Sequence, residues 1–139
     1  MAKYLVVANQ TLGGEQLMDE VRRRVAGGPS SFYVLVPNTG GGGGDTASAS
    51  EAERRATLTA QSRLHQALNQ LRAERVEVQG DLGDPDPLTA IGDVLATGQF
   101  DAIIISTLPG GISRWLGMDL PRRVARKFKL PVTTVMAKG

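Results

Sequence analysis

Short runs of apolar residues alternate along this chain with longer amphipathic stretches, and this alternation limits the fold more than any other feature. The first run, residues 4–8, is apolar throughout, and residues 102–105 form a second run of the same kind. Uninterrupted apolar strands are typical of parallel sheets that are covered on both faces. The alternation therefore predicts repeated β-α units and an α/β fold.

The periodicity and the turn residues together predict five strands and four helices. The strands are expected at residues 4–8, 32–36, 76–79, 102–105 and 132–136. The helices are expected around the apolar positions of residues 17–25, between Ser50 and Leu71, between Asp86 and Gly98, and around residues 120–128. Ser50 with Glu53 forms a capping-box pattern, and Asp86 followed by Pro87 is a strong helix start.

Strict alternation of strands and helices predicts a single domain over residues 1–139, a doubly wound five-stranded parallel sheet with helices on both faces. The two most apolar strands should lie at the centre, which gives the order 3-2-1-4-5 with the fifth strand at an edge. Ligands of such sheets bind beyond the carboxyl ends of the strands where the winding reverses. Function is therefore expected in the loops after the first and fourth strands, residues 9–14 and 106–118.

Composition removes several classes of chemistry. The chain has no cysteine and one histidine, His65, so thiol catalysis is excluded and histidine-based metal sites are disfavoured. No apolar run reaches the length of a membrane span and no signal-peptide pattern is present, which predicts a cytoplasmic protein. The net charge is +2, yet the segment from Arg114 onward carries seven basic residues and one acidic residue. A basic segment of this kind suits an anion or an acidic neighbouring subunit.

Five consecutive glycines, residues 40–44, resemble a nucleotide-binding loop only superficially. A phosphate loop needs glycines at fixed offsets and a helix that starts at once. Uniform glycine predicts a mobile surface loop instead, one that is able to close over a ligand.

Several segments together resemble the universal stress protein family over nearly the whole chain. The opening residues 3–9 are similar to that family's first strand, and the stretch from Gly83 to Ile91 is similar to the approach to its third helix. Residues 100–106 and 130–132 resemble the strand before its nucleotide motif and its last strand. The resemblance implies a Rossmann-like nucleotide-binding fold, a role in stress response, and homodimers.

The chain departs from that family at the residues that contact ATP. ATP-binding members carry two spaced glycines and then a glycine-serine or glycine-threonine pair, but this chain has Ser106, Pro109, Asp119 and Leu120 at those spacings. Asn9 stands where the family has an aspartate. Asp119 is the expected N-cap of the last helix, where its carboxylate would compete with a phosphate for backbone N–H groups. Weak or absent ATP binding is therefore predicted.

Polar residues near the expected crevice are nonetheless candidates for ligand binding. Backbone amides of the glycines and the Arg114 guanidinium suit an anion, while the side chains after the first strand suit a base or ribose. The candidate set is Asn9, Gln10, Thr11, Ser106, Thr107, Gly110, Gly111, Ser113 and Arg114. Alternatively, Thr11 caps the first helix, Asp119 pairs with Arg122 or Arg123, and Trp115 is a packing anchor rather than a stacking platform.

These observations predict a small-ligand-binding or regulatory module without catalytic residues and without a metal site. ATP or another adenine nucleotide is the candidate cofactor, and the alternative function is an adenine-nucleotide-binding protein or an enzyme acting on adenylates. The fifth strand ends the sheet and alternates in polarity, so it is expected to pair with its copy in a homodimer. Membrane binding is not expected. Nucleic-acid binding is disfavoured, because aromatic residues make up only 4% of the chain.

Overall fold

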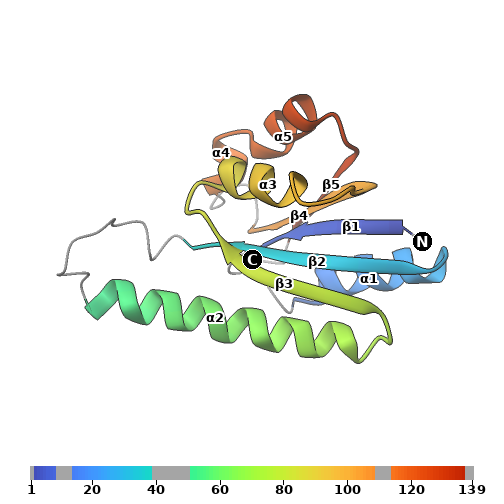
Figure 1. Cartoon of the computed structure of the whole chain (residues 1–139), viewed down its shortest axis with the longest axis horizontal. Helices are drawn as coiled ribbons and strands as arrows, with labels where there is room; N and C mark the ends of the chain where they lie inside the picture. The colour runs from blue at the N-terminus through green and yellow to red at the C-terminus, as the bar shows by residue number, and fades with distance from the viewer. Residues whose placement is uncertain (1, 9–13, 39–50, 109–113, 137–139) are drawn as a thin grey trace.

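The computed structural model describes residues 2–8, 14–38, 51–108 and 114–136. Five parallel strands form one sheet in the order β3-β2-β1-β4-β5, which confirms the predicted topology (Figure 1). The strands are β1 (Ala2–Val7), β2 (Ser30–Pro37), β3 (Glu77–Gly83), β4 (Ala102–Thr107) and β5 (Val132–Met136). The chain begins in the middle of the sheet and winds outward twice, first to β3 and then to β5.

Helices cover both faces of the sheet, again as predicted. They are α1 (Glu15–Ala26), α2 (Glu51–Arg72), α3 (Pro87–Leu95), α4 (Arg114–Gly117) and α5 (Leu120–Phe128). Helices α1 and α2 lie on one face, and α3 and α5 lie on the other (Figure 1). The four-residue helix α4 was not predicted. Within the described residues, no helix combines the length and the apolarity needed to cross a bilayer.

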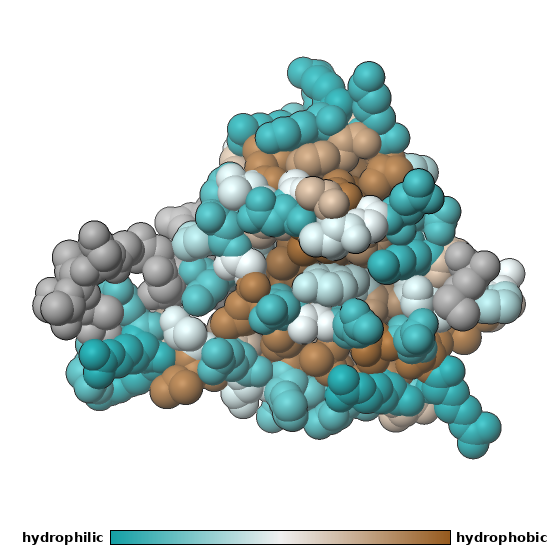
Figure 2. All heavy atoms as spheres, viewed as in Figure 1, coloured by the Kyte–Doolittle hydropathy of each residue, from teal (hydrophilic) through white to brown (hydrophobic). Residues whose placement is uncertain are grey.

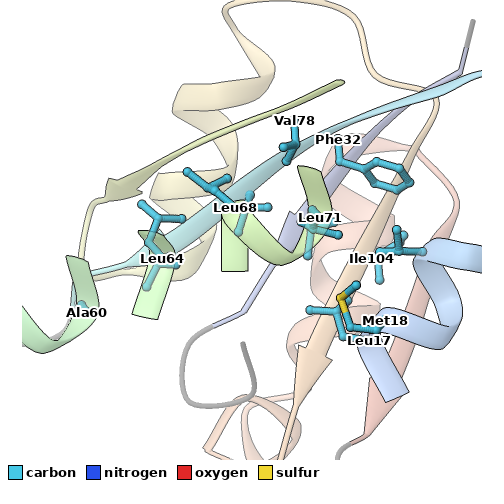
Figure 3. Close-up of a cluster of buried hydrophobic side chains, with 13 residues drawn as sticks. Leu17, Met18, Phe32, Ala60, Leu64, Leu68, Leu71, Val78 and Ile104 are labelled. Atoms are coloured by element: carbon cyan, nitrogen blue, oxygen red, sulfur yellow. The ribbon is translucent and has the colours of Figure 1, made fainter. Parts of the chain in front are cut away.

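Two apolar clusters hold these layers together, one on each face of the sheet. The first joins α1 and α2 to the sheet and includes Ile104 (Figure 3). The second joins α3 and α5 to the sheet and includes Ile103 and Ile105. Successive side chains of a strand point to opposite faces, so a central strand covered on both sides must be apolar at every position. All three isoleucines are fully buried, which explains the uninterrupted apolar run.

The longest helix follows the predicted amphipathic pattern. The apolar stripe of α2 is buried against the sheet at each predicted position: Ala60, Leu64, Ala67, Leu68 and Leu71. His65 lies outside this stripe and is exposed. Hydrophilic residues predominate on the outer surfaces of α2 and α5, and hydrophobic residues are visible between these helices and the sheet (Figure 2). Ser50 of the predicted capping box lies outside the described residues.

The start of α3 is confirmed in detail. Asp86 is the N-cap, and its carboxylate accepts hydrogen bonds from the backbone N–H of Thr89 at 3.1 Å and from the Thr89 hydroxyl at 2.7 Å. Pro87 occupies the first turn, where a missing N–H costs nothing. The helix ends at Leu95 with Ala96 as C-cap, three residues before the glycine that we expected to end it.

Strand β3 differs most from its predicted extent. It was expected at residues 76–79 but continues to Gly83, because it pairs with β2 from Ser31↔Glu77 to Pro37↔Gly83. The second half contains glycine and aspartate, which are poor strand formers. Pairing with a well-formed neighbour supplies the ladder hydrogen bonds that the local sequence does not predict.

Candidate functional site

The carboxyl ends of β1 and β4 mark the point where the winding of the sheet reverses. The two strands are adjacent and parallel, with Val7 paired to Ile105. From β1 the chain passes to α1 on one face, and from β4 it passes to α4 and α5 at the other (Figure 1). The helices that follow the two strands thus lie on opposite faces of the sheet, which is the arrangement that creates a ligand crevice in open α/β sheets.

Two of the predicted site residues, Ser106 and Thr107, are the last residues of β4. Both are buried, with exposed fractions of 2% and 3%. Because they are successive residues of a strand, Ser106 points to the face of α1 and α2 and Thr107 points to the face of α3 and α5. The Thr107 hydroxyl donates to the carbonyl oxygen of Leu108 at 2.9 Å. The two hydroxyls were predicted to belong to one site, but the structure places them on opposite sides of the sheet.

Most of the other predicted site residues lie outside the part of the chain that the structure describes. These residues are Asn9, Gln10, Thr11, Gly110, Gly111 and Ser113. The same holds for the glycines of residues 40–44. Arg114 is the first residue of α4, and only its backbone is described. The N-cap position of α1 is Gly14, which has no side chain to accept a hydrogen bond.

Asp119 does not cap α5 in the manner predicted. It occupies the N-cap position, and its carbonyl oxygen accepts the first helical hydrogen bond from the Arg123 N–H at 3.1 Å. Its side chain makes no capping hydrogen bond. The reason is conformational: Asp119 is left-handed, with φ 56° and ψ 40°, whereas a capping side chain requires an extended N-cap residue. The tight turn between α4 and α5 imposes this conformation.

The Asp119 carboxylate instead faces Arg122, which is one of the two alternative pairings predicted from the sequence. The Arg122 Nε lies 3.6 Å from Asp119 Oδ2, and both side chains are exposed. Pro121 supplies no N–H to the first turn of this helix. The amino end of α5 therefore carries a negative charge that is partly balanced by Arg122, and it has one donor fewer than an ordinary helix.

Trp115 belongs to the packing of this region. It is half-buried, and together with Met118 it packs against the apolar cluster on the face of α3 and α5. This supports the interpretation of Trp115 as an anchor for α4.

Asn38 also lies at the carboxyl end of the sheet, directly after β2, and it is not among the predicted site residues. Its backbone N–H donates to the carbonyl oxygen of Gly83 at 2.9 Å, and its side-chain oxygen accepts from the Thr57 hydroxyl at 3.4 Å. Asn38 thus ties the ends of β2 and β3 to α2. One feature of the sequence could have indicated Asn38: it directly follows an apolar strand, at the carboxyl end where ligands of such sheets bind.

Charged side chains near the carboxyl end of the sheet lie on α5 and at the start of α3. The pKa of the Asp86 carboxyl is lowered, first by the hydrogen bonds from Thr89 and further by the positive charges of Arg123 and Lys127. Within the described residues, no group of three or more histidine, cysteine, aspartate or glutamate side chains could hold a metal ion.

Comparison with solved structures gives matches over almost the full length of the chain. The structure of a universal stress protein from Archaeoglobus fulgidus matches with a TM-score of 0.61 and 20% identity, covering 97% of this chain and 93% of that one. The chain has the fold of the universal stress proteins. The resemblance noted in the sequence is thereby confirmed at the level of the fold.

Two universal stress proteins with bound nucleotides also match. The structure of the universal stress protein from Archaeoglobus fulgidus in complex with dAMP has a TM-score of 0.59 and 21% identity, and covers 96% of this chain and 97% of that one. A universal stress protein in complex with cAMP has a TM-score of 0.50 and 16% identity, and covers 99% and 98%. No protein-family model and no curated protein matches the sequence.

Proposed function

We propose that this protein is a small-ligand-binding module whose ligand occupies the crevice beyond β1 and β4. The observation that carries the proposal is the reversal of winding between these two strands, since ligands of open α/β sheets bind at that point. The candidate ligand groups are Asn9, Gln10 and Thr11 from one side. From the other side they are Thr107 and the segment from Gly110 to Arg114.

Within this module, a nucleoside with a single phosphate group is a better candidate ligand than ATP. Two of the structurally similar universal stress proteins carry dAMP and cAMP. A triphosphate needs many N–H donors and positive charges, whereas a monophosphate needs few. Pro121 and the exposed Asp119 carboxylate reduce what the amino end of α5 offers to a longer phosphate tail.

Composition supports a role in binding rather than in bond-making chemistry. The chain has no cysteine, and its one histidine is exposed on α2 and points away from the sheet. An enzyme acting on adenylates at the same crevice is the alternative, and release of AMP or phosphate from ATP by the purified protein would favour it.

Calorimetric titration with AMP, dAMP and ATP tests the ligand class directly. We expect AMP or dAMP to bind at least as tightly as ATP, and Asn9→Ala to weaken their binding. Asn69→Ala, which removes the same group from the exposed side of α2, is the matched control and should leave binding unchanged. Micromolar or tighter binding of ATP, well ahead of AMP, would contradict the proposal.

We also propose that the protein forms a homodimer through β5. This strand is at the edge of the sheet and pairs with β4 on one side. The Ile103 N–H donates to the carbonyl oxygen of Pro131 at 2.9 Å, which sets the ladder. Every second residue of a parallel strand directs its backbone N–H and C=O groups to the same neighbouring strand. Because Pro131 bonds to β4, the backbone groups of Thr133 and Val135 also point to β4. Val132, Thr134 and Met136 then present N–H and C=O groups to the open edge, and antiparallel pairing about Thr134 would place two such edges together.

A further inference from the structure

A hollow of about 380 Å³ lies at the opposite end of the sheet from the crevice, where β1 and β2 begin and α1 ends. The strands contribute Ala2, Tyr4 and Ser30 to its lining. The end of α1 contributes Arg23 and Arg24, and the turn of residues 27–29 completes it. The volume is within the range of small-molecule sites, which is about 300–1,000 Å³.

Arg24 is held in one position at this hollow by three neighbours. Its Nε donates to Glu20 Oε2 at 2.7 Å, and its Nη2 donates to the Thr133 hydroxyl at 2.8 Å. Its guanidinium lies over the Tyr4 ring, 5.0 Å from the centroid. Only 22% of the side chain is exposed. A guanidinium fixed in this way loses little further conformational entropy when it binds an anion.

Charge at the hollow is not balanced. Glu20 is 7% exposed and accepts from both arginines, with the Arg23 Nη1 at 3.0 Å from its Oε1. Within the described residues, Arg23 and Arg24 form ion pairs with Glu20 alone, so two guanidinium groups share one carboxylate. Burial acts to lower the pKa of Arg24, but the hydrogen bond and charge of Glu20, with a contribution from Tyr4, raise it, so the group stays cationic. One positive charge is left over at the wall of the hollow.

Apolar surface lies beside this charge. Ala2 and Pro29 line the same hollow, with the ring of Tyr4. An inorganic ion would leave this surface in water, whereas a small organic anion would cover it and also neutralise the surplus charge.

We propose that the hollow formed by Tyr4, Arg23, Arg24 and the turn at residues 27–29 is a second binding site, for a small organic monoanion with an apolar body. The carboxylate oxygens accept hydrogen bonds from the guanidinium groups of Arg23 and Arg24, and the apolar body lies against Ala2 and Pro29. This site is independent of the crevice beyond β1 and β4, and its existence does not require that the crevice bind a nucleotide.

Titration with benzoate and with phenylacetate, followed by the amide NMR signals of Gly27, Gly28 and Ser30, tests the proposal. We expect saturable shifts with a dissociation constant on the order of 1 mM, as suits ligands of this size. Arg23→Gln should weaken binding about tenfold, since it removes a charge-assisted hydrogen bond. Phenol, which lacks the charge, should shift these signals little.

Arg22→Gln is the matched control, because it removes the same charge from the next residue of α1. Arg22 pairs with Asp19 and Glu74 and does not line the hollow, so its loss should leave the affinity within about twofold. Arg24→Gln alone would leave Glu20 buried with one partner fewer. The double variant Glu20→Gln/Arg24→Gln removes one positive and one negative charge, so it keeps the net charge at the hollow and leaves no carboxylate buried without a partner. It should remain folded yet lose binding, because the fixed guanidinium is gone.

Three results would overturn the proposal. The first is the absence of saturable shifts up to about 50 mM, well beyond the range expected for such ligands. The second is equal weakening by Arg22→Gln and Arg23→Gln, which would indicate an unspecific charge effect. The third is an equal response to phenol and benzoate. Signals of Ser106 and Thr107 report on the crevice separately, so failure at one site is distinguishable from failure at the other.

Discussion

Gly80 lies in the middle of β3, directly beneath α2. A Cβ atom at this position would lie 2.7 Å from the carbonyl oxygen of Val34 and 3.1 Å from side-chain carbons of Leu64 and Leu68. The nearest of these contacts is with backbone, which cannot move without disturbing the β2-β3 ladder. The glycine therefore permits the close approach of α2 to this edge of the sheet.

We predict that Gly80→Ala lowers the free energy of unfolding by about 1–3 kcal/mol, the usual cost of overpacking. Urea unfolding followed by circular dichroism measures the change. Gly117→Ala is the control, because nothing lies within 4 Å of a Cβ at that position, and its effect should stay within about 0.5 kcal/mol. Equal stability of the Gly80 variant and the parent would show that α2 can shift at little cost.

Asp119 is one of the residues on which the predicted weakness of ATP binding depends. We expect Asp119→Asn to raise the affinity for ATP by about two- to fivefold, since a charge near a helix end is worth about 0.3–1 kcal/mol. Asparagine tolerates the left-handed conformation of this residue, so the backbone should be preserved.

Asp19→Asn is a matched control for that measurement. Asp19 also pairs with an arginine three residues later on an exposed helix surface, with Arg22 at 3.4 Å, but on α1. An unchanged ATP affinity in Asp119→Asn, or an equal gain in both variants, would remove Asp119 from the explanation.

At the scale of elements, α3 begins with the clearest local signal in the chain. The Asp86 carboxylate is bonded to Thr89, and its pKa is lowered. A carboxyl whose pKa is lower in the folded state stabilises the fold above its unfolded pKa, and this contribution is lost as the pH falls through the folded pKa.

We predict that Asp86→Ala costs about 1 kcal/mol near neutral pH, the typical value of an N-cap. The difference from the parent should shrink as the pH falls below the ordinary carboxyl value of 3.8. Asp86→Asn keeps the accepting oxygen, so it should lose less stability than Asp86→Ala at neutral pH. Because neither variant titrates at this position, both differences from the parent should change with pH by the same amount. Thermal unfolding across a pH series measures both. A difference that grows toward low pH would contradict the assignment.

The open edge of β5 gives the second prediction at this scale. Thr134→Pro removes an N–H that faces away from β4, and proline is tolerated on edge strands. We therefore expect the variant to fold but to sediment as a monomer. Thr134→Ala removes the same side chain and keeps the N–H, so it should remain dimeric. A dimer that survives in the proline variant would place the interface elsewhere.

The whole molecule contains two apolar clusters that share one sheet. Strand β4 contributes to both, through Ile104 on one face and Ile103 and Ile105 on the other. A perturbation of either face should therefore reach the other, and we propose that the chain unfolds as one cooperative domain.

Leu71→Ala tests this proposal, because Leu71 lies in the first cluster and the chain's one tryptophan, Trp115, packs against the second. We expect a loss of about 2–5 kcal/mol. The midpoint of unfolding should fall equally when it is followed by Trp115 fluorescence and by circular dichroism. Separate transitions for the two probes would indicate two independent units.

The sequence by itself determined the number of strands, their order and the start of α3. These features depend on patterns that are local or repeat along the chain: the continuous apolar runs of the central strands, the stripe of α2, and the pair Asp86 and Pro87. The switch point followed from the order of the strands, so the position of the candidate crevice could also be predicted.

Only the tertiary structure decided the features that depend on contacts between distant segments. Strand β3 reaches Gly83 because β2 pairs with it, and Ser106 and Thr107 separate because helices cover both faces of β4. Asp119 lost its capping role because the turn between α4 and α5 fixes its backbone. The hollow beside Arg24 forms where the starts of β1 and β2 meet the end of α1, and Arg24 is held there by Thr133 of β5, more than a hundred residues away in the sequence. Local propensities do not contain such information, since it arises when the layers pack.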